Sequence, residues 1–303
     1  PPSQETSNQS IPSGISSTFI KDLERLQQDL IDEEVTGSNV VLVNYENESL
    51  YHKVINSGRS GDRDIAESTL FPIWSMSKPI TIVAMMALHE QGLFEWNDPV
   101  SQYIPSFANL KVKDKEEGVR PAKEPLRIIH LMTHRSGYDY YRYISLPDYE
   151  QPHPIQSRFE DLSHYVEVVA KYPVEFEPGS KYLYGINQAI LGRLVEVFSK
   201  QPFEEYLKQT LFEPLGMNAT SFSLDAERRV RLQPLFINAG NLKGYTDPLT
   251  QAFLDEQNYS PDSKAHFGGE GLISCLEDYA KFCEMLTNGG NYRGRQIISQ
   301  ASI

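Results

Sequence analysis

The strongest constraint in this sequence is the run Ser75-Met76-Ser77-Lys78-Pro79, which lies directly before an apolar helical pattern. Proline is tolerated in the first turn of a helix but not in its interior, so the helix that continues through Met86 must begin near Ser75. Lys78 then lies about one turn from Ser75 on the same helix face. A serine hydroxyl becomes a nucleophile when a neighbouring base removes its proton, and a lysine at this spacing can reach it. This run, the only Ser-x-x-Lys in the sequence, therefore predicts a reactive serine at the start of a helix.

The remaining patterns predict a mixed architecture. Apolar residues recur at helical spacing over 19–31, with Ser16, Ser17 or Thr18 available as the N-cap. Two runs rich in β-branched and aromatic residues, 40–45 and 50–55, flank a polar turn and predict a β-hairpin. Helical patterns follow over 80–91, 162–170, 190–198 and 276–286. The order predicts an α/β (α+β) fold, with an antiparallel sheet flanked by helices and an inserted, mostly helical region.

The same patterns suggest a division of the chain into three parts. Residues 1–15 are polar and rich in proline and serine, so we expect a flexible tail. Residues 16–74 and 268–303 are expected to form the sheet region. Residues 75–267 are expected to form the mostly helical region that carries the nucleophile helix.

Composition narrows the choice of partners. The 28 Lys and Arg residues against 41 Asp and Glu residues leave a formal charge of −13. Nucleic acid and anionic membranes both require a positive face, so neither is an expected partner. No run approaches the roughly 18–20 apolar residues that a membrane-spanning helix needs. The sequence opens at Pro1 without a recognisable signal peptide, so we expect a processed N-terminus. The sequence leaves the compartment open: cytoplasmic, or periplasmic or secreted after processing. It also leaves the oligomeric state open.

Beyond the Ser-x-x-Lys run, longer segments resemble a known family. Residues 68–107 resemble the nucleophile region of the serine β-lactamase and penicillin-binding-protein superfamily, and more closely the branch of class C β-lactamases and related esterases. Four further blocks follow in the family's order, at 126–140, 176–196, 212–222 and 267–290. The resemblance implies a β-lactamase/transpeptidase-like fold, an acyl-enzyme on Ser75, no metal or organic cofactor, and a small-molecule ester or amide as the substrate.

The resemblance also implies a catalytic tyrosine. The family carries a Tyr-x-Asn motif after a Pro-Gly turn, which here is Pro178-Gly179. The downstream pair Leu191-Gly192 sets the register and points to Tyr184, with Tyr182 as the competing candidate. Tyr184 would lie near Lys78, and the two side chains would pass the proton of the serine to the leaving group.

This chain departs from the family pattern inside that motif. Its third residue is Ile186, and Asn187 follows one position late. An isoleucine offers no amide to the side chain of a β-lactam, so the change favours ester chemistry, although Asn187 could still reach the site. Ile186 and Asn187 are candidate substrate-binding residues. Gly269 of the Gly268-Gly269 block is another, and so is Tyr138, which opens the aromatic stretch 138–154; this stretch could equally pack the helical region.

The family's third motif is absent before Ile303. The family places a tripeptide such as Lys-Thr-Gly or His-x-Gly on a strand beyond Gly268-Gly269, and this strand supplies the second oxyanion N–H group. We therefore expect the last strands of the sheet and the closing helix to lie beyond the sequence or on another chain. Loss of one such donor costs about 10²- to 10³-fold in rate.

A metal site is a weaker interpretation of the histidines. His130 and His134 have the spacing that places two imidazoles on one helix face, but no glutamate follows His130, as a metalloprotease motif would require. We therefore expect no metal.

Three functions remain in competition. The first is a serine hydrolase acting on small esters, as a carboxylesterase or acyl-transferase. The second is a β-lactamase or D-Ala-D-Ala carboxypeptidase. The third is a non-catalytic relative that binds a partner, which the absence of the third motif leaves open.

Overall fold

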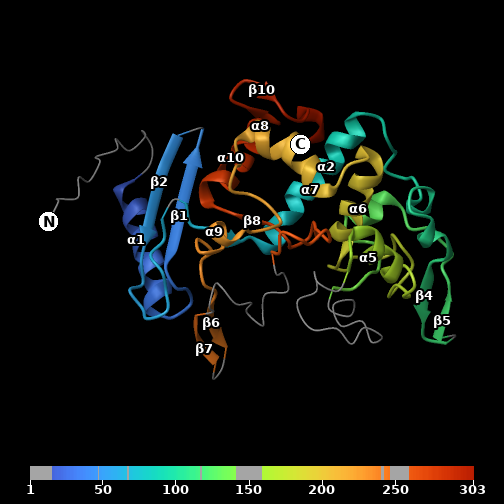
Figure 1. Ribbon diagram of the computed structural model, residues 1–303, viewed down its shortest axis with the longest axis horizontal. Coiled ribbons are helices and arrows are strands. Elements are labelled where there is room, and N and C mark those ends of the chain that lie inside the picture. Colours follow the sequence, from blue (N-terminus) through green and yellow to red (C-terminus); the bar gives the residue numbers. More distant parts are fainter. Residues whose placement is uncertain are drawn as a thin grey trace. The chain divides into compact units, whose positions relative to one another are not determined.

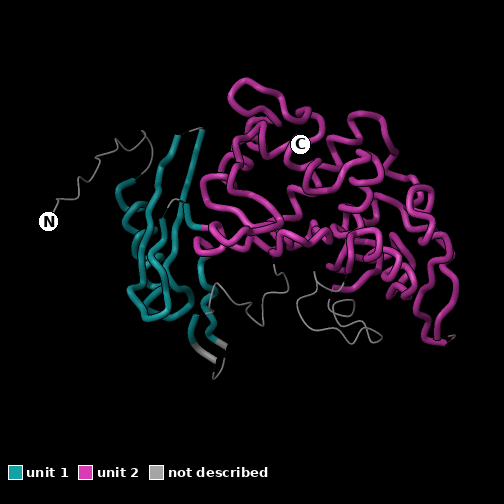
Figure 2. Tube along the Cα trace, in the orientation of Figure 1, with its two compact units in different colours: residues 1–69, 233–250 teal, residues 70–232, 251–303 magenta. Residues whose placement is uncertain are grey.

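The computed structural model describes residues 16–46, 48–66, 68–116, 118–140, 159–239, 242–245 and 259–303. The chain divides into two compact units, residues 1–69 with 233–250, and residues 70–232 with 251–303 (Figure 2). The expected tail at 1–15 lies outside the described residues, and so do residues 141–154 of the aromatic stretch. The division into sheet and helical regions made from the sequence stays a prediction.

Unit 1 contains the helix and hairpin that the sequence predicts (Figure 1). Helix α1 (Ser17–Asp32) begins at Ser16, whose hydroxyl accepts a hydrogen bond from the Phe19 N–H at 3.2 Å. Strands β1 (Asn39–Tyr45) and β2 (Glu48–Ile55) pair antiparallel. A second antiparallel pair joins β6 (Phe236–Ala239) and β7 (Leu242–Tyr245).

A buried glutamine joins α1 to the hairpin in unit 1. The Gln27 side-chain amide donates to Asn39 Oδ1 at 2.7 Å and accepts a hydrogen bond from the Tyr51 hydroxyl. Gln27 is only 2% exposed, so these partners replace the water that the amide loses on folding. These hydrogen bonds therefore help to fix the position of α1 on the hairpin.

The regular elements of unit 2 are mainly helices among its described residues. Its helices are α2 (Ser77–Glu90), α3 (Ile128–Met132), α5 (Leu162–Val169), α6 (Asn187–Ser199), α7 (Phe203–Leu207), α8 (Glu213–Leu215), α9 (Ala226–Arg229) and α10 (Leu276–Thr287). Its strands are β3 (Phe71–Pro72), β4 (Lys111–Asp114), β5 (Gly118–Pro121), β8 (Ile273–Ser274), β9 (Asn291–Tyr292) and β10 (Arg295–Gln296). The strands pair antiparallel as β3 with β8, β4 with β5, and β9 with β10. The described residues thus combine helices with small antiparallel sheets, which confirms the predicted mixed class.

The nucleophile helix begins where Pro79 requires. A 3-10 turn over Trp74–Met76 leads directly into α2, so that Pro79 lies in the first turn of the α-helix. Gly92 follows the helix with a φ of +69°, and its N–H donates to the His89 carbonyl at 2.8 Å. This is the C-terminal cap expected from the glycine.

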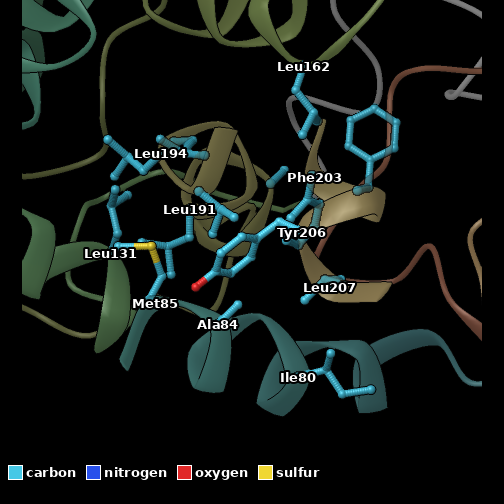
Figure 3. Packing of buried hydrophobic residues seen from close by; sticks show 14 of the residues in the cluster. Ile80, Ala84, Met85, Leu131, Leu162, Leu191, Leu194, Phe203, Tyr206 and Leu207 are labelled. Carbon is cyan, nitrogen blue, oxygen red and sulfur yellow. The ribbon is translucent and has the colours of Figure 1, made fainter. Parts of the chain in front are cut away.

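The core of unit 2 holds α2 against α6 and α7. Ile80, Ala84 and Met85 lie on α2 and are completely buried. Figure 3 shows them in one cluster with Leu191 and Leu194 of α6 and with side chains of α7. Full burial of a large aliphatic side chain contributes about 1.5–3 kcal/mol, so this cluster holds the first turn of α2 in place relative to α6.

Candidate active site

Ser75 lies on an exposed turn that other parts of unit 2 hold in place. The preceding residue, Trp74, has a φ of +39°, which a bulky residue rarely adopts and which marks strain in the turn. Tyr279 of α10 donates a hydrogen bond to the Met76 carbonyl at 3.0 Å. Burial raises the pKa of Tyr279 to about 12, so its hydroxyl stays protonated and remains a donor. The turn thereby presents the Ser75 hydroxyl toward solvent.

Lys78 lies one turn along and faces Ser75, as the spacing predicts. Its side chain is 8% exposed, and its Nζ donates to Ser75 Oγ at 3.0 Å. The same Nζ donates to the main-chain carbonyl of Gly269 at 2.7 Å. The Gly269 carbonyl is therefore a hydrogen-bond acceptor in the site, and it holds the side chain of Lys78.

Tyr184 completes the group. Its hydroxyl lies 2.7 Å from Ser75 Oγ, although the two residues are 109 positions apart in the sequence. Lys78 Nζ lies 4.8 Å from the centre of the Tyr184 ring and 5.3 Å from that of Tyr140. The competing candidate, Tyr182, is 67% exposed. The tyrosine that forms the hydrogen bond with Ser75 is Tyr184.

The structure does not bring all of the predicted substrate-binding side chains to the surface. Ile186 is 6% exposed and packs in the main apolar core. Tyr138 is fully buried and lies edge to face on Phe107, with ring centres 6.1 Å apart. The interpretation of Tyr138 as part of a binding wall is therefore wrong, because its ring contributes to the core instead. Asn187 is also completely buried, and its amide is directed at His134.

Sequence reasoning missed the residues that place Gly269. Ser77 and Thr81 lie one turn apart on α2 and are both completely buried. Thr81 Oγ1 donates to the Gly268 carbonyl at 2.7 Å, and Ser77 Oγ accepts from the Leu272 N–H at 3.1 Å. These bonds attach the 268–272 turn to the start of α2. Two small polar residues at i and i+4 among the apolar residues of this helix were the available signal.

Pairing of short strands completes this attachment. In the β3–β8 pair, Phe71 lies opposite Ser274 and Pro72 opposite Ile273. The Ile73 N–H continues the pattern and donates to the Leu272 carbonyl at 3.0 Å. The chain thus arrives at Ser75 alongside the segment that supplies Gly269.

The two histidines have separate roles in the structure. Helix α3 ends at Met132, so His130 and His134 do not share a helix face, and His130 Nδ1 accepts from the Arg127 N–H at 3.2 Å. His134 instead stacks on Tyr184 with ring centres 4.8 Å apart. In the part of the chain that the structure describes, no group of three or more His, Cys, Asp or Glu side chains is placed to hold a metal ion.

Burial and the nearby Lys78 lower the pKa of His134 to about 4. The imidazole is therefore neutral near pH 7. No signal in the sequence alone pointed to its contact with the tyrosine, because 50 residues separate the two positions in the chain.

Comparison with known proteins identifies the family. A family model described as Beta-lactamase matches residues 23–302. The chain belongs to the Beta-lactamase family. This assignment confirms the resemblance to serine β-lactamases and penicillin-binding proteins and the β-lactamase/transpeptidase-like fold.

The individual relatives share less than 30% sequence identity with this chain. Protein Rv1367c of Mycobacterium tuberculosis is 27% identical over 267 residues, which cover 83% of this chain and 63% of that protein. A protein of Salmonella schwarzengrund, named provisionally as a D-alanyl-D-alanine carboxypeptidase, is 28% identical over 78% of this chain and 55% of its own length. This chain thus spans somewhat more than half the length of these relatives.

Solved structures agree with the fold. EstCE1, described as a hydrolase with promiscuous acyltransferase activity, matches with a TM-score of 0.75 and 22% identity over 93% of this chain and 74% of that chain. At this identity the likeness concerns the fold. Among the described residues, no helix is both long and apolar enough to cross a membrane.

Proposed function

We propose that this protein is a serine hydrolase that acts through an acyl-enzyme on Ser75 and prefers small esters. The observation that carries the proposal is the chain of hydrogen bonds from Lys78 Nζ to Ser75 Oγ and on to the Tyr184 hydroxyl, at 3.0 and 2.7 Å. Members of the Beta-lactamase family are serine hydrolases, and the site has the nucleophile and the proton-handling groups that this chemistry requires.

The donors and acceptors in this chain favour one direction of proton transfer. An ammonium group has donors and no acceptor, so Ser75 Oγ accepts the hydrogen bond from Lys78. The serine proton is then available for the hydrogen bond to the Tyr184 oxygen. With Tyr184 as a phenolate that the Lys78 ammonium group stabilises, its oxygen accepts this proton, and the oxygen lone pair of Ser75 attacks a carbonyl carbon.

The proposed reaction has two halves. In acylation, the Ser75 Oγ–C bond forms, the proton of the serine passes to the Lys78–Tyr184 pair, the ester C–O bond breaks, and the departing alcohol takes the proton. In deacylation, water gives its proton to the same pair, its oxygen bonds to the acyl carbon, and Ser75 Oγ leaves with a proton. The main-chain N–H of Ser75 is the first oxyanion donor, and the family's third motif is expected to supply the second.

The Tyr184 motif supports esters as the preferred substrates. Ile186 takes the place of the asparagine that β-lactam chemistry uses, and its side chain is buried in the core. Asn187 does not replace that amide, because its Nδ2 is 2.8 Å from His134 Nδ1 and the residue is completely buried. A substrate amide would thus meet no amide partner from this motif, which weakens selection for β-lactams.

A D-Ala-D-Ala carboxypeptidase is the second candidate function. The provisional name of the Salmonella relative at 28% identity favours it. A binding protein without catalysis is the third, and the covalent labelling described next separates it from the other two.

The test uses the intact protein with a fluorophosphonate probe and three substrates: a short-chain nitrophenyl ester, a chromogenic cephalosporin and a D-Ala-D-Ala peptide. We expect one probe per molecule on Ser75 by mass spectrometry, turnover of the ester, and loss of both in Ser75→Ala with an unchanged melting temperature. Fast cephalosporin or peptide hydrolysis without ester turnover would reject the ester preference. Absence of the probe from Ser75 would support the binding protein.

A pair of neighbouring tyrosines provides a matched control for the proton-transfer role. Tyr184→Phe and Lys78→Ala should each lower kcat/KM by about 10²-fold or more, the usual contribution of general acid–base groups. Tyr182→Phe removes the same hydroxyl two residues away and should leave kcat/KM within about twofold of the parent. If Tyr182→Phe is the damaging change and Tyr184→Phe is not, the assignment of the tyrosine is wrong.

A further inference from the structure

Tyr184 is held by contacts from outside its own segment. It lies in the irregular segment that precedes α6, and its side chain is 43% exposed. Catalysis nevertheless requires its hydroxyl to stay near the 2.7 Å distance from Ser75 Oγ. A displacement of about 1 Å can cost about 10²-fold in rate, so the groups that hold the ring matter for the reaction.

His134 contacts Tyr184 and both of its neighbours in the chain. The His134 carbonyl accepts from the Leu183 N–H at 2.8 Å, and its Nδ1 accepts from the Gly185 N–H at 3.2 Å. Its imidazole stacks on the Tyr184 ring at 4.8 Å with an angle of 17° between the planes. Tyr140 lies on Tyr184 as well, at 5.8 Å and 21°. One residue thus holds the main chain on each side of the tyrosine and also one face of its ring.

His134 is itself firmly held. The Asn187 amide nitrogen lies 2.8 Å from Nδ1, and the Gln188 amide nitrogen lies 3.2 Å from Nε2. Both residues belong to the first turn of α6, and they are 0% and 2% exposed. The φ of His134 is +54°, which is unfavourable for a residue with a side chain, so these tertiary contacts maintain it.

The hydrogen bonds also determine the tautomer of the ring. Nδ1 faces the Gly185 N–H, so it must present a lone pair, and the proton of a neutral imidazole lies on Nε2. Gln188 Oε1 is buried without a hydrogen-bond partner among the described residues, and a half-turn of this amide would direct it at Nε2. The lowered pKa of His134 agrees with a neutral ring beside Lys78.

We infer that His134 is a positioning residue for Tyr184: its neutral Nε2–H imidazole, fixed by Asn187 and Gln188, holds the tyrosine hydroxyl at Ser75. The inference rests on the proposed function, because it assigns His134 a role only through Tyr184. His134 touches neither Ser75 nor the reacting carbonyl in this scheme, so its effect must disappear when the tyrosine hydroxyl is removed.

A double-mutant cycle tests this dependence. The four proteins are the parent, His134→Asn, Tyr184→Phe and the double variant, and the measurement is kcat and KM for the nitrophenyl ester. Asparagine tolerates the positive φ but lacks the stacked ring. In the parent background, His134→Asn should lower kcat about 10- to 100-fold and leave KM within about twofold. In the Tyr184→Phe background the same change should have less than about a twofold effect.

The outcomes separate this inference from the proposed function. If His134→Asn lowers kcat equally in both backgrounds, or in neither while Tyr184→Phe lowers it, the positioning role is wrong and the proposed function stands. If Tyr184→Phe has no effect on kcat, the proposed catalytic role of Tyr184 is wrong, and the positioning role of His134 is wrong with it. His130→Asn, a change in the same segment away from Tyr184, is the control and should leave kcat unchanged.

A second measurement does not depend on the folding of any variant. Nitrogen-15 NMR of the unsubstituted protein with labelled histidine should show His134 at pH 7 with the proton on Nε2 and an unprotonated Nδ1. Observation of the Nδ1–H tautomer, or of a charged ring at pH 7, would overturn the inference.

Discussion

Two adjacent glycines allow a sharp test of the packing around the site. An ideal Cβ on Gly268 would lie 2.6 Å from Thr81 Oγ1, 2.8 Å from the Gln188 carbonyl oxygen and 3.1 Å from Phe203 Cε1. These atoms belong to α2, α6 and α7, and all three residues are at most 2% exposed. The Gln188 carbonyl is part of the backbone of α6, and the buried side chains of Thr81 and Phe203 have little room to turn away. Gly268→Ala should therefore lower the free energy of unfolding by about 1–3 kcal/mol, the usual cost of overpacking.

Gly269→Ala is the matched control. An ideal Cβ there would lie 3.5 Å from Lys78 Nζ and 3.8 Å from Gln188 Cβ, which are ordinary contacts. Loss of glycine also restricts the unfolded chain and can stabilise by about 0.4–1 kcal/mol. Gly269→Ala should therefore leave the free energy of unfolding within about 1 kcal/mol of the parent value.

Urea denaturation of both variants measures the difference. We expect a lower midpoint for Gly268→Ala with an unchanged m value, and a midpoint near that of the parent for Gly269→Ala. At about 2–4 °C per kcal/mol, the melting temperature of Gly268→Ala should fall by about 2–12 °C. Equal stability of the two variants would refute the conclusion that three helices meet at Gly268.

Two further changes test contacts on which the fold and the site depend. The Asp62 carboxylate accepts hydrogen bonds from the Ser38 N–H at 2.7 Å and from the hydroxyls of Ser38 and Ser57, so Asp62→Asn should cost about 1–3 kcal/mol of unfolding free energy in urea. Burial raises the pKa of Asp62, but these hydrogen bonds together hold it below its ordinary value. The carboxylate therefore stabilises the fold above about pH 4 and loses this effect as the pH falls through its lowered pKa, and Asp62→Asn should flatten the acid limb of a stability–pH curve. Tyr279→Phe removes the hydrogen bond to the Met76 carbonyl, so it should cost about 0.5–1.5 kcal/mol in thermal denaturation and slow the labelling of Ser75 by the probe. An unchanged labelling rate would show that α10 does not hold the nucleophile turn.

Local features of the fold could be predicted from the sequence because each depends on neighbouring residues. Pro79 determined where the nucleophile helix begins, Gly92 ended α2, and Ser16, one of the three candidates for the N-cap, caps the first helix. The three-residue spacing of Ser75 and Lys78 likewise determined their approach, since helix geometry alone brings them together.

Contacts between distant segments required the tertiary structure. The Tyr184 register came from a family resemblance, and the 2.7 Å contact with Ser75 depends on how α2 packs against α6. For Tyr138 the sequence left two alternatives, a binding wall or packing in the helical region, and the structure buries its ring, because the burial of an aromatic residue depends on its surroundings and not on its type.

The sequence alone therefore determined which residues could perform the chemistry and how the nucleophile helix presents two of them. The tertiary structure decided which tyrosine meets the serine, that a glycine carbonyl holds the lysine, and that His134 lies against Tyr184. The physical reason is the sequence separation of the partners: hydrogen bonding within a helical turn follows from the backbone, whereas contacts across 51 to 191 residues follow from the packing of whole helices.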